Sequence, residues 1–409
     1  MAWFRIIIFS GLLLLPIGCA TYARKIQNVR YLFESAQYEP AVLELEELAS
    51  KKDNELLLYL LELGMVNHAS GKYAEAIEKF KEAEKIAVLN DYTSISQEVG
   101  SVLFNDSTKE YKGEDFEKIL INVYMAIDYT LLGKWDSALV ECRRVNQKLD
   151  VMISKGKMPY QYNSFAKYLA ASLFESQREY NDAFVDYRAV KKWMSEFPYL
   201  SGPLMRVADK LKAEEELSGY LKEFPNQRNY RLAQGEGEVI LVLEQGRAPY
   251  KVPDPAFDLI PMFIKNGSAF ERATLRSATS ERSADAEVLF DIESNAIREL
   301  EGKIALIMAK KVGGIAAKRA MAYGIGQATK SKDAEFMSFL LLLATDHADL
   351  RSWVTLPAKL RIARLTLPAG RHDLVLDMVS SGRQMMVKKW GSVIVKAGQI
   401  SFLNLRVFD

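Results

Sequence analysis

Apolar positions in the first half of the chain recur with helical spacing, and the pattern itself repeats. The stretch AQYEPAVLELEEL, which starts at Ala36, aligns with GKYAEAIEKFKEA, which starts at Gly71. The alignment places Tyr38 over Tyr73 at a spacing of 35 residues. A repeat of this length, with apolar residues three and four apart, predicts pairs of antiparallel helices stacked side by side.

The second copy has the residue types of the tetratricopeptide repeat, whose period is about 34 residues. Small residues, Gly64 and Ala76, let the two helices of a pair approach closely, and a large residue such as Phe80 fills the groove between successive pairs. The matching positions are Leu60, Leu63, Gly64, Gly71, Tyr73, Ala76, Phe80 and Ala83.

Two looser copies follow in GKWDSALVECRRV and REYNDAFVDYRAV, with packing positions at Trp135, Ala138, Tyr180 and Ala183. Their spacing exceeds the repeat period, which predicts insertions at 99–118 and 151–162. A further helix is expected at 204–223, between prolines that end the helical half. We therefore expect residues 19–228 to form a tetratricopeptide-like superhelix.

A superhelix of this kind offers a concave surface to a protein or peptide partner. The expected partner-binding residues are Tyr129, Tyr168, Tyr187 and Arg143. The alternative is that four irregular pairs form only a compact helical domain without a binding surface.

From Gly235 onward the apolar period changes to two, which is typical of strands. GEGEVILVLEQG alternates between glycines, and further strands are expected at 259–264, 269–276 and 287–291. The three prolines of RAPYKVPDPAF exclude a central strand there. Residues 235–409 should therefore form a mixed α/β region, and the whole chain an α+β fold.

Two helices are expected at 291–327 and 332–347. The first contains KKVGGIAAKRAMAYGIGQ, whose small residues suit close helix packing or a kink. A membrane-active glycine zipper is the alternative. Because Lys310, Lys311, Lys318 and Arg319 interrupt the apolar run, we favour close packing.

The last fifty residues alternate again about the turns PAG and KAG, which predicts a small antiparallel sheet or sandwich at 356–409. This region resembles PEGA-type modules of surface proteins, which are associated with carbohydrate or the cell wall. The resemblance implies a second function, in which the module binds peptidoglycan or another polysaccharide.

The N-terminus has the features of a signal segment. An apolar run at 6–18 follows Arg5, and its 13 residues suit a signal rather than a membrane span. The residues before Cys19 resemble the lipobox of bacterial lipoproteins, although Pro16 departs from it. The resemblance implies a signal peptide at 1–18, lipidation of Cys19 and, because Ala20 follows, sorting to the outer membrane. Ordinary cleavage after Ala20 is the alternative.

Composition excludes several classes of function. The 409 residues carry 54 basic and 53 acidic side chains, so the chain lacks the basic charge of a nucleic-acid-binding protein. Cys142, in a helical stretch, is expected to be a buried, unreactive thiol. No cysteine or histidine spacing indicates a metal site.

We also find no sequence support for catalysis or a cofactor. His347 and Asp349 could be a base and its orienting partner, but two residues apart on a helix they point to different faces. No nucleophile elbow or phosphate-binding loop accompanies them. We therefore expect that the protein is not an enzyme, with no catalytic residues, no metal and no cofactor.

Several blocks together resemble an uncharacterised family of bacterial envelope lipoproteins with a tetratricopeptide-like first half. They are YKGEDFEKILINVYMAIDYTLLGKWDSALVECRRVNQKL, YNDAFVDY, GEVILVLEQGRAPYKV and ATDHADLRSWVTLPAKLRIARLTLPAG. The resemblance implies a protein anchored at the outer membrane that faces the periplasm. Its motif residues are Gly113, Glu114, Asp115, Glu141, Arg143, Arg351 and Trp353, for which capping or salt bridging is favoured over ligand contact.

The sequence thus favours a lipid-anchored scaffold or adaptor in cell-wall or envelope assembly. Its expected partners are another envelope protein, bound by the helical repeats, and the membrane, reached through the N-terminal lipid. The alternative is a glycan-binding or peptidoglycan-binding envelope protein.

Overall fold

The computed structural model describes residues 22–97, 109–154, 163–227, 229–267, 270–343, 346–380 and 383–408. The expected signal segment, Pro16 and Cys19 lie outside these residues, as do 99–108 and 155–162 of the two predicted insertions.

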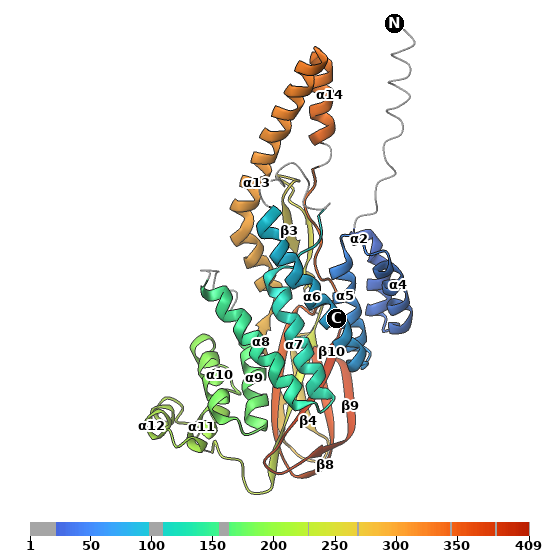
Figure 1. The fold of residues 1–409 in the computed structure, drawn as a ribbon. Coiled ribbons are helices and arrows are strands. Elements are labelled where there is room, and N and C mark those ends of the chain that lie inside the picture. The colour runs from blue at the N-terminus through green and yellow to red at the C-terminus, as the bar shows by residue number, and fades with distance from the viewer. Residues whose placement is uncertain are drawn as a thin grey trace.

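Five antiparallel helix pairs form the first half of the described chain (Figure 1). After the short α2 (Tyr22–Lys25), the pairs are α3 (Gln27–Glu34) with α4 (Tyr38–Ser50), α5 (Leu56–Ala69) with α6 (Tyr73–Gln97), α7 (Asp115–Leu131) with α8 (Trp135–Ser154), α9 (Ser164–Ser176) with α10 (Tyr180–Trp193), and α11 (Ser201–Lys210) with α12 (Glu214–Glu223). The predicted tetratricopeptide-like region is confirmed.

Each pair turns in the same way. The second helix of four pairs begins at the predicted aromatic residue, and two positions earlier the backbone is left-handed, at Ala36, Gly71, Gly133 and Arg178. The turn at Gly71 shows why, because its N–H donates to the carbonyl of His68 and the next N–H to that of Asn67. These bonds close the first helix and reverse the chain.

Three helix boundaries differ from the prediction. Helix α7 begins at Asp115, so 115–118 are helical instead of inserted loop. The expected helix at 204–223 is broken into α11 and α12, because Lys212 adopts a left-handed conformation and forms the turn of a fifth pair. Helix α8 continues to Ser154, so 151–154 are helical instead of inserted loop.

The second half contains two four-stranded sheets. One has the order β10 (Ile400–Val407), β1 (Glu236–Gln245), β7 (Lys359–Pro368), β6 (Glu287–Asp291), and the other β5 (Ser283–Asp285), β4 (Arg272–Ser277), β8 (Gly370–Ser380), β9 (Arg383–Val395). Strands β2 (Tyr250–Pro253) and β3 (Pro261–Ile264) pair only with each other. The predicted module is therefore a sandwich that also uses β1 and β4–β6, and it is not wholly antiparallel, because β10 runs parallel to β1.

Strand β1 is the middle of a three-layer structure. Val239, Leu241 and Leu243 point into the core between the two sheets, whereas Ile240 and Val242 point into the core shared with the helices. Because side chains alternate along a strand, β1 is covered on both faces.

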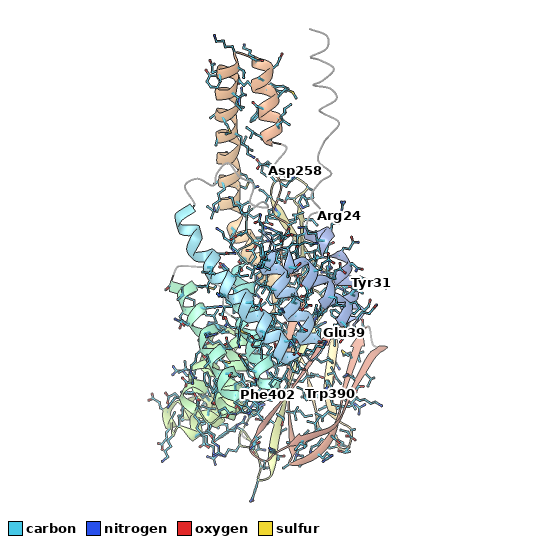
Figure 2. The ribbon with its side chains drawn as sticks, turned by 45° about the vertical axis from the view of Figure 1, so that its right-hand side comes forward. Arg24, Tyr31, Glu39, Asp258, Trp390 and Phe402 are labelled. Atoms are coloured by element: carbon cyan, nitrogen blue, oxygen red, sulfur yellow. The ribbon has the colours of Figure 1, made fainter. Side chains whose placement is uncertain are left out.

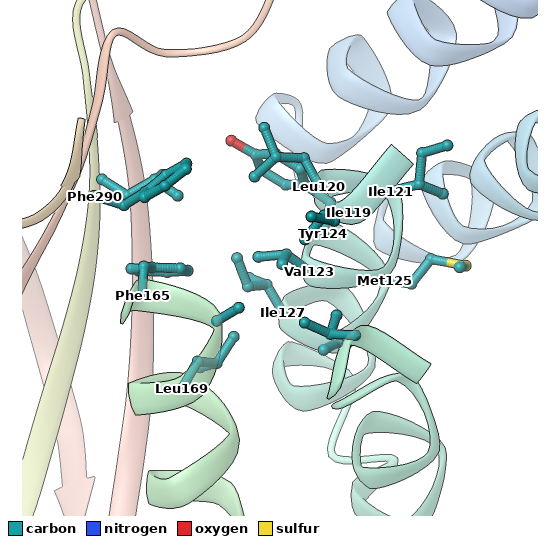
Figure 3. Close-up of a cluster of buried hydrophobic side chains, with 14 of the residues drawn as sticks. Ile119, Leu120, Ile121, Val123, Tyr124, Met125, Ile127, Phe165, Leu169 and Phe290 are labelled. Atoms are coloured by element: carbon teal, nitrogen blue, oxygen red, sulfur yellow. The ribbon is translucent and has the colours of Figure 1, made fainter. Parts of the chain in front are cut away.

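The helices and the first sheet share one apolar core. Figure 3 shows Phe290 of β6 facing Phe165 and Leu169 of α9, with the side chains of α7 beside them. The ring centroids of Phe402 on β10, which is labelled in Figure 2, and of Trp135 at the start of α8 lie 6.1 Å apart. The repeat region and the β region are therefore packed together as one body.

A helical hairpin completes the fold. Helix α13 (Ile292–Thr329) follows β6 and turns at Lys330 into α14 (Lys332–Leu343). Both helices agree with the prediction, although α14 ends four residues before His347. The hairpin projects from the body (Figure 1).

Candidate functional site

The first helix of each central repeat pair lies inside the molecule. Helices α5, α7 and α9 are buried almost all round, since the second helices of the pairs cover one side and the sheet β10-β1-β7-β6 covers the other. The face expected to receive a partner is therefore occupied by the chain's own C-terminal half.

This arrangement corrects two of the predicted partner-binding residues. Tyr168 and Tyr187 are fully buried, and the ring centroids of the pair lie 5.6 Å apart. Both hydroxyl oxygens accept hydrogen bonds from Arg364 of β7, at 3.1 and 3.0 Å. They bind the protein's own sheet and offer no surface to another molecule.

Arg364 is the centre of a buried ion cluster between the two halves. Its guanidinium donates to Glu175 of α9 at 2.9 Å and to Glu238 of β1 at 2.6 Å. Arg206 of α11 bridges the same two carboxylates at 2.7 and 2.8 Å. Two arginines thus neutralise two glutamates, which is the condition under which buried charges are tolerated.

The ion pairs of this cluster shift the pKa values of its members so that the charged forms are favoured. Burial raises the pKa of Glu175, but Arg206 and Arg364 outweigh it and lower that pKa to about 2. Burial lowers the pKa of Arg364, but Glu238 and the two tyrosines nearby hold it well above its usual value. Glu175, Arg206 and Arg364 therefore stay charged across the physiological range of pH.

A second buried polar site is built on His68 of α5. Its Nδ1 lies 2.5 Å from Asp128 of α7, and its Nε2 lies 2.7 Å from Glu244 of β1. Tyr124 donates to Glu244 at 3.2 Å, and Asn404 of β10 donates to the same carboxylate at 2.8 Å. Two helices and two strands meet at this imidazole.

The carboxylates keep His68 charged. Burial lowers its pKa, but Asp128 and Glu244 outweigh that effect and raise the pKa to about 10. Burial raises the pKa of Asp128 to about 6 despite the opposing charge of His68. The histidine side chain has no exposed surface, so a substrate cannot reach this imidazole and its role is to join the two halves.

A non-helical segment of the chain, residues 352–356, lies between α5 and α7. Glu62 accepts from the backbone N–H groups of Val354 and Thr355, at 2.9 and 3.2 Å, and Glu117 accepts from that of Trp353 at 2.8 Å. The Trp353 ring is buried against Phe80. The repeats thus bind their own peptide, with a buried carboxylate on each helix.

Sequence reasoning missed Glu62, Glu238, Glu244 and Arg364. A signal was present, because each is a charged residue inside a run that is otherwise apolar, such as EVILVLEQ for β1. A helix or strand that is apolar on every side is buried on every side. A charge within it must therefore meet an opposite charge or a hydrogen-bond partner.

Arg143 is the predicted partner-binding residue with the most exposed position. It borders an open groove of about 540 Å³ between α8 and α10, lined also by Val151, Val185 and Phe174. Its guanidinium lies 5.2 Å from the ring centroid of Phe174 and donates to Glu179 at 2.6 Å. Val185 is 63% exposed, so the groove presents apolar surface beside charge.

The other predicted residues have simpler places. Tyr129 is half-buried at the end of α7, where the ammonium of Lys81 lies 5.9 Å from its ring centroid. The repeat-packing alanines Ala76, Ala138 and Ala183 are fully buried, and Tyr73, Trp135 and Tyr180 are half-buried. Gly64 lies against Phe80, whose ring would be 2.3 Å from an added Cβ.

The motif residues around position 113 form part of a helix start. Glu114 and Glu117 form a capping box at the N-terminus of α7, and Glu114 also accepts from Lys251 at 2.6 Å. Arg351 pairs with Asp349 at 2.8 Å, and Glu141 accepts from Asn122 at 2.7 Å. These contacts are the capping and salt bridging that the sequence favoured.

A large polar cleft separates α9 and α11 from the turn between β9 and β10. Its volume is about 940 Å³, and its lining includes Arg178, Tyr180, Arg231 and Glu236. Arg231 pairs with Asp209 at 2.7 Å.

The described residues give no support for a metal site, a membrane-spanning helix or a reactive thiol. No group of three or more metal-ligating side chains occurs there. Within the same ranges, no helix has the length and apolar character to cross a membrane. Cys142 is buried, and burial raises its pKa well above the usual value.

This chain has only limited similarity to known proteins. A scan of protein-family models and a search of curated proteins found no match. Among solved structures, MamA from AMB-1 covers 51% of this chain and 92% of its own, with 11% identity and a TM-score of 0.33. Nearly identical TPR-like repeats of a Podosopora anserina kinesin light chain cover 49% and 92%, with 15% identity and a TM-score of 0.32. These TM-scores carry no functional argument, and the repeat fold rests on the helices described above.

Proposed function

We propose that this protein is an adaptor of the bacterial cell envelope, held at the outer membrane by a lipid on Cys19 and facing the periplasm. In this proposal the outer surface of the helical repeats binds another envelope protein. The observation that carries it is the open groove between α8 and α10, which combines exposed Val185 with the guanidinium of Arg143.

The groove is favoured because the inner face of the repeats is already filled. A partner of the repeats must therefore use the second helices of the pairs. An apolar side chain surrounded by charged and amide groups, here Asp182, Asn146 and Asp150, matches the usual composition of a protein-binding surface.

Site-specific photo-crosslinking in intact cells tests the proposal. A crosslinking residue in place of Val185 should capture a protein, and Arg143→Glu in the same chain should reduce the capture. Leu43, which is exposed on α4 away from the groove, is the matched control position. Absence of an adduct at Val185, or equal capture at Leu43, would overturn this docking site.

The anchor is tested separately. A palmitate analogue should label the natural chain but not the Cys19→Ala variant, and the label should follow the outer-membrane fraction. Equal labelling of the two chains would show that Cys19 is not the lipidation site.

The polar cleft near Arg231 favours the second function, glycan binding. Cationic side chains, carboxylates and the ring of Tyr180 can contact sugar hydroxyls and faces, and the cleft volume suits a short oligosaccharide. The full chain should then be retained by purified sacculi, and Arg178→Ala with Arg231→Ala should weaken retention. Arg276→Ala, on β4 of the sheet β5-β4-β8-β9, is the control.

A further inference from the structure

The hairpin α13–α14 stands on a rigid base. The first part of α13 is buried against the body, and Glu299 accepts from the backbone N–H groups of Asp115 and Phe116, at 2.9 and 3.1 Å. Lys303 donates to Glu114 at 3.0 Å. Beyond this point α13 rises out of the body beside α14 (Figure 1). Its direction is therefore set by the contacts at its base.

The inner side of the hairpin carries its buried charges. Lys318 is 1% exposed, pairs with Asp346 at 2.7 Å and donates to the carbonyl of Leu342 at 2.9 Å. Lys311 donates to the carbonyl of His347 at 3.0 Å. The small residues Gly314, Ala322 and Gly326 lie on the same inner side and allow the close approach.

The outer sides of the hairpin are apolar. Its exposed large side chains are Leu306, Met308, Val312, Met321, Tyr323, Ile325, Phe336, Met337, Leu340 and Leu341. Between 304 and 326, Lys310 and Arg319 are the only exposed charged residues. This is the reverse of a helical hairpin in water, which buries its apolar face and exposes its charges. The arrangement suits an apolar environment outside the hairpin.

The position of the hairpin and its exposed charges indicate which apolar environment covers its outer sides. Figure 2 shows Arg24 of α2 and Asp258 at the end of the body from which the hairpin rises. The described chain begins at this end with Tyr22, three residues after Cys19. From residue 304 onward, the exposed charged residues of the hairpin are Lys310, Arg319, Lys330, Lys332 and Asp333, an excess of basic residues. Anionic phospholipid complements both the charge and the apolar surface.

We propose that the hairpin α13–α14 is a membrane-contact device, whose outer apolar faces enter the surface of a bilayer containing anionic phospholipid. Its orientation towards the membrane rests on the proposed anchor at Cys19. A second attachment strengthens the membrane binding that a single lipid chain provides. Attachment at two points, the lipid and the hairpin, also fixes the orientation of the helical repeats relative to the bilayer.

Vesicle flotation tests the proposal without the lipid. The chain from Ala20 onward, which keeps every described residue, is mixed with vesicles of phosphatidylethanolamine and phosphatidylglycerol. It should float with the vesicles, and Leu306→Glu together with Val312→Glu should lower the bound fraction by more than about tenfold. Leu43→Glu, at an exposed apolar position on α4 outside the hairpin and the groove, should float like the natural chain.

Two results would overturn the inference. One is the absence of flotation of the natural chain. The other is an oligomer that forms with rising protein concentration and is abolished by Leu306→Glu and Val312→Glu, while vesicle binding stays unchanged. That result would show that the apolar faces bind a second copy of the chain. Circular dichroism melting of each variant shows that the fold is retained. The flotation test uses unlipidated protein. A negative result would therefore not affect the crosslinking test at Val185 or the labelling test at Cys19.

Discussion

Arg364 of β7 donates to Glu175 of α9 across 189 positions of sequence, and this contact joins the β region to the helical repeats. Both side chains are almost fully buried. The repeats of this protein therefore use their inner face to bind their own chain, and the surface left for partners is the outer one.

Removal of Arg364 should destabilise the protein strongly. Arg364→Met leaves Glu175 and Glu238 with only Arg206 as a charged partner, and losing one member of a buried ion cluster costs about 3–5 kcal/mol. Urea unfolding measures the change. Arg276→Met breaks an exposed pair with Asp377 and should cost less than about 1 kcal/mol. Equal losses in the two variants would contradict the prediction.

Stability should fall as pH rises, because of His68. Its pKa is raised from 6.5 to about 10, so the folded state keeps a proton that the unfolded state has lost over this interval. The stabilisation is complete below pH 6.5 and disappears as pH approaches 10, with a slope of about 1 kcal/mol per pH unit between pH 7 and 9.

Denaturant unfolding from pH 7 to 9 checks this dependence. The His68→Gln variant should be less stable at pH 7 and should lose less stability than the natural chain as pH rises. Parallel curves for the two proteins would show that another group is responsible.

A methyl group at position 64 should be costly. In Gly64→Ala the new Cβ would meet the buried Phe80 ring, and overpacking of this kind costs about 1–3 kcal/mol. Gly219→Ala, in helix α12 with open space around the new Cβ, should be neutral or stabilise by up to about 1 kcal/mol. The double variant Gly64→Ala, Phe80→Leu should recover part of the loss in thermal unfolding, and no recovery would contradict the proposed clash.

The thiol of Cys142 should be unreactive while the protein is folded. Burial raises its pKa, so the thiolate that attacks disulfide reagents is scarce. In the Cys19→Ala chain an aromatic disulfide reagent should detect one thiol in urea and almost none in native buffer. Rapid reaction of the native protein would show that Cys142 is accessible.

The sequence predicted local structure well where one period was sustained. Tyr38, Tyr73, Trp135 and Tyr180 marked the start of four helices, because interhelix turns and close packing restrict residue types at fixed spacing. The break at Lys212 was missed, since a lysine in a left-handed conformation leaves no composition signal.

By itself, the sequence determined the helix pairs, the main strands, the long hairpin and the burial of Cys142, all of which depend on residues close together in the chain. Tertiary structure decided what those elements meet. Only it showed that Tyr168 and Tyr187 bind Arg364, and that Lys318 faces inward while Leu306 faces out. The reason is physical, because a periodic pattern tells which side of an element is buried but not whether solvent, the same chain or a membrane covers it.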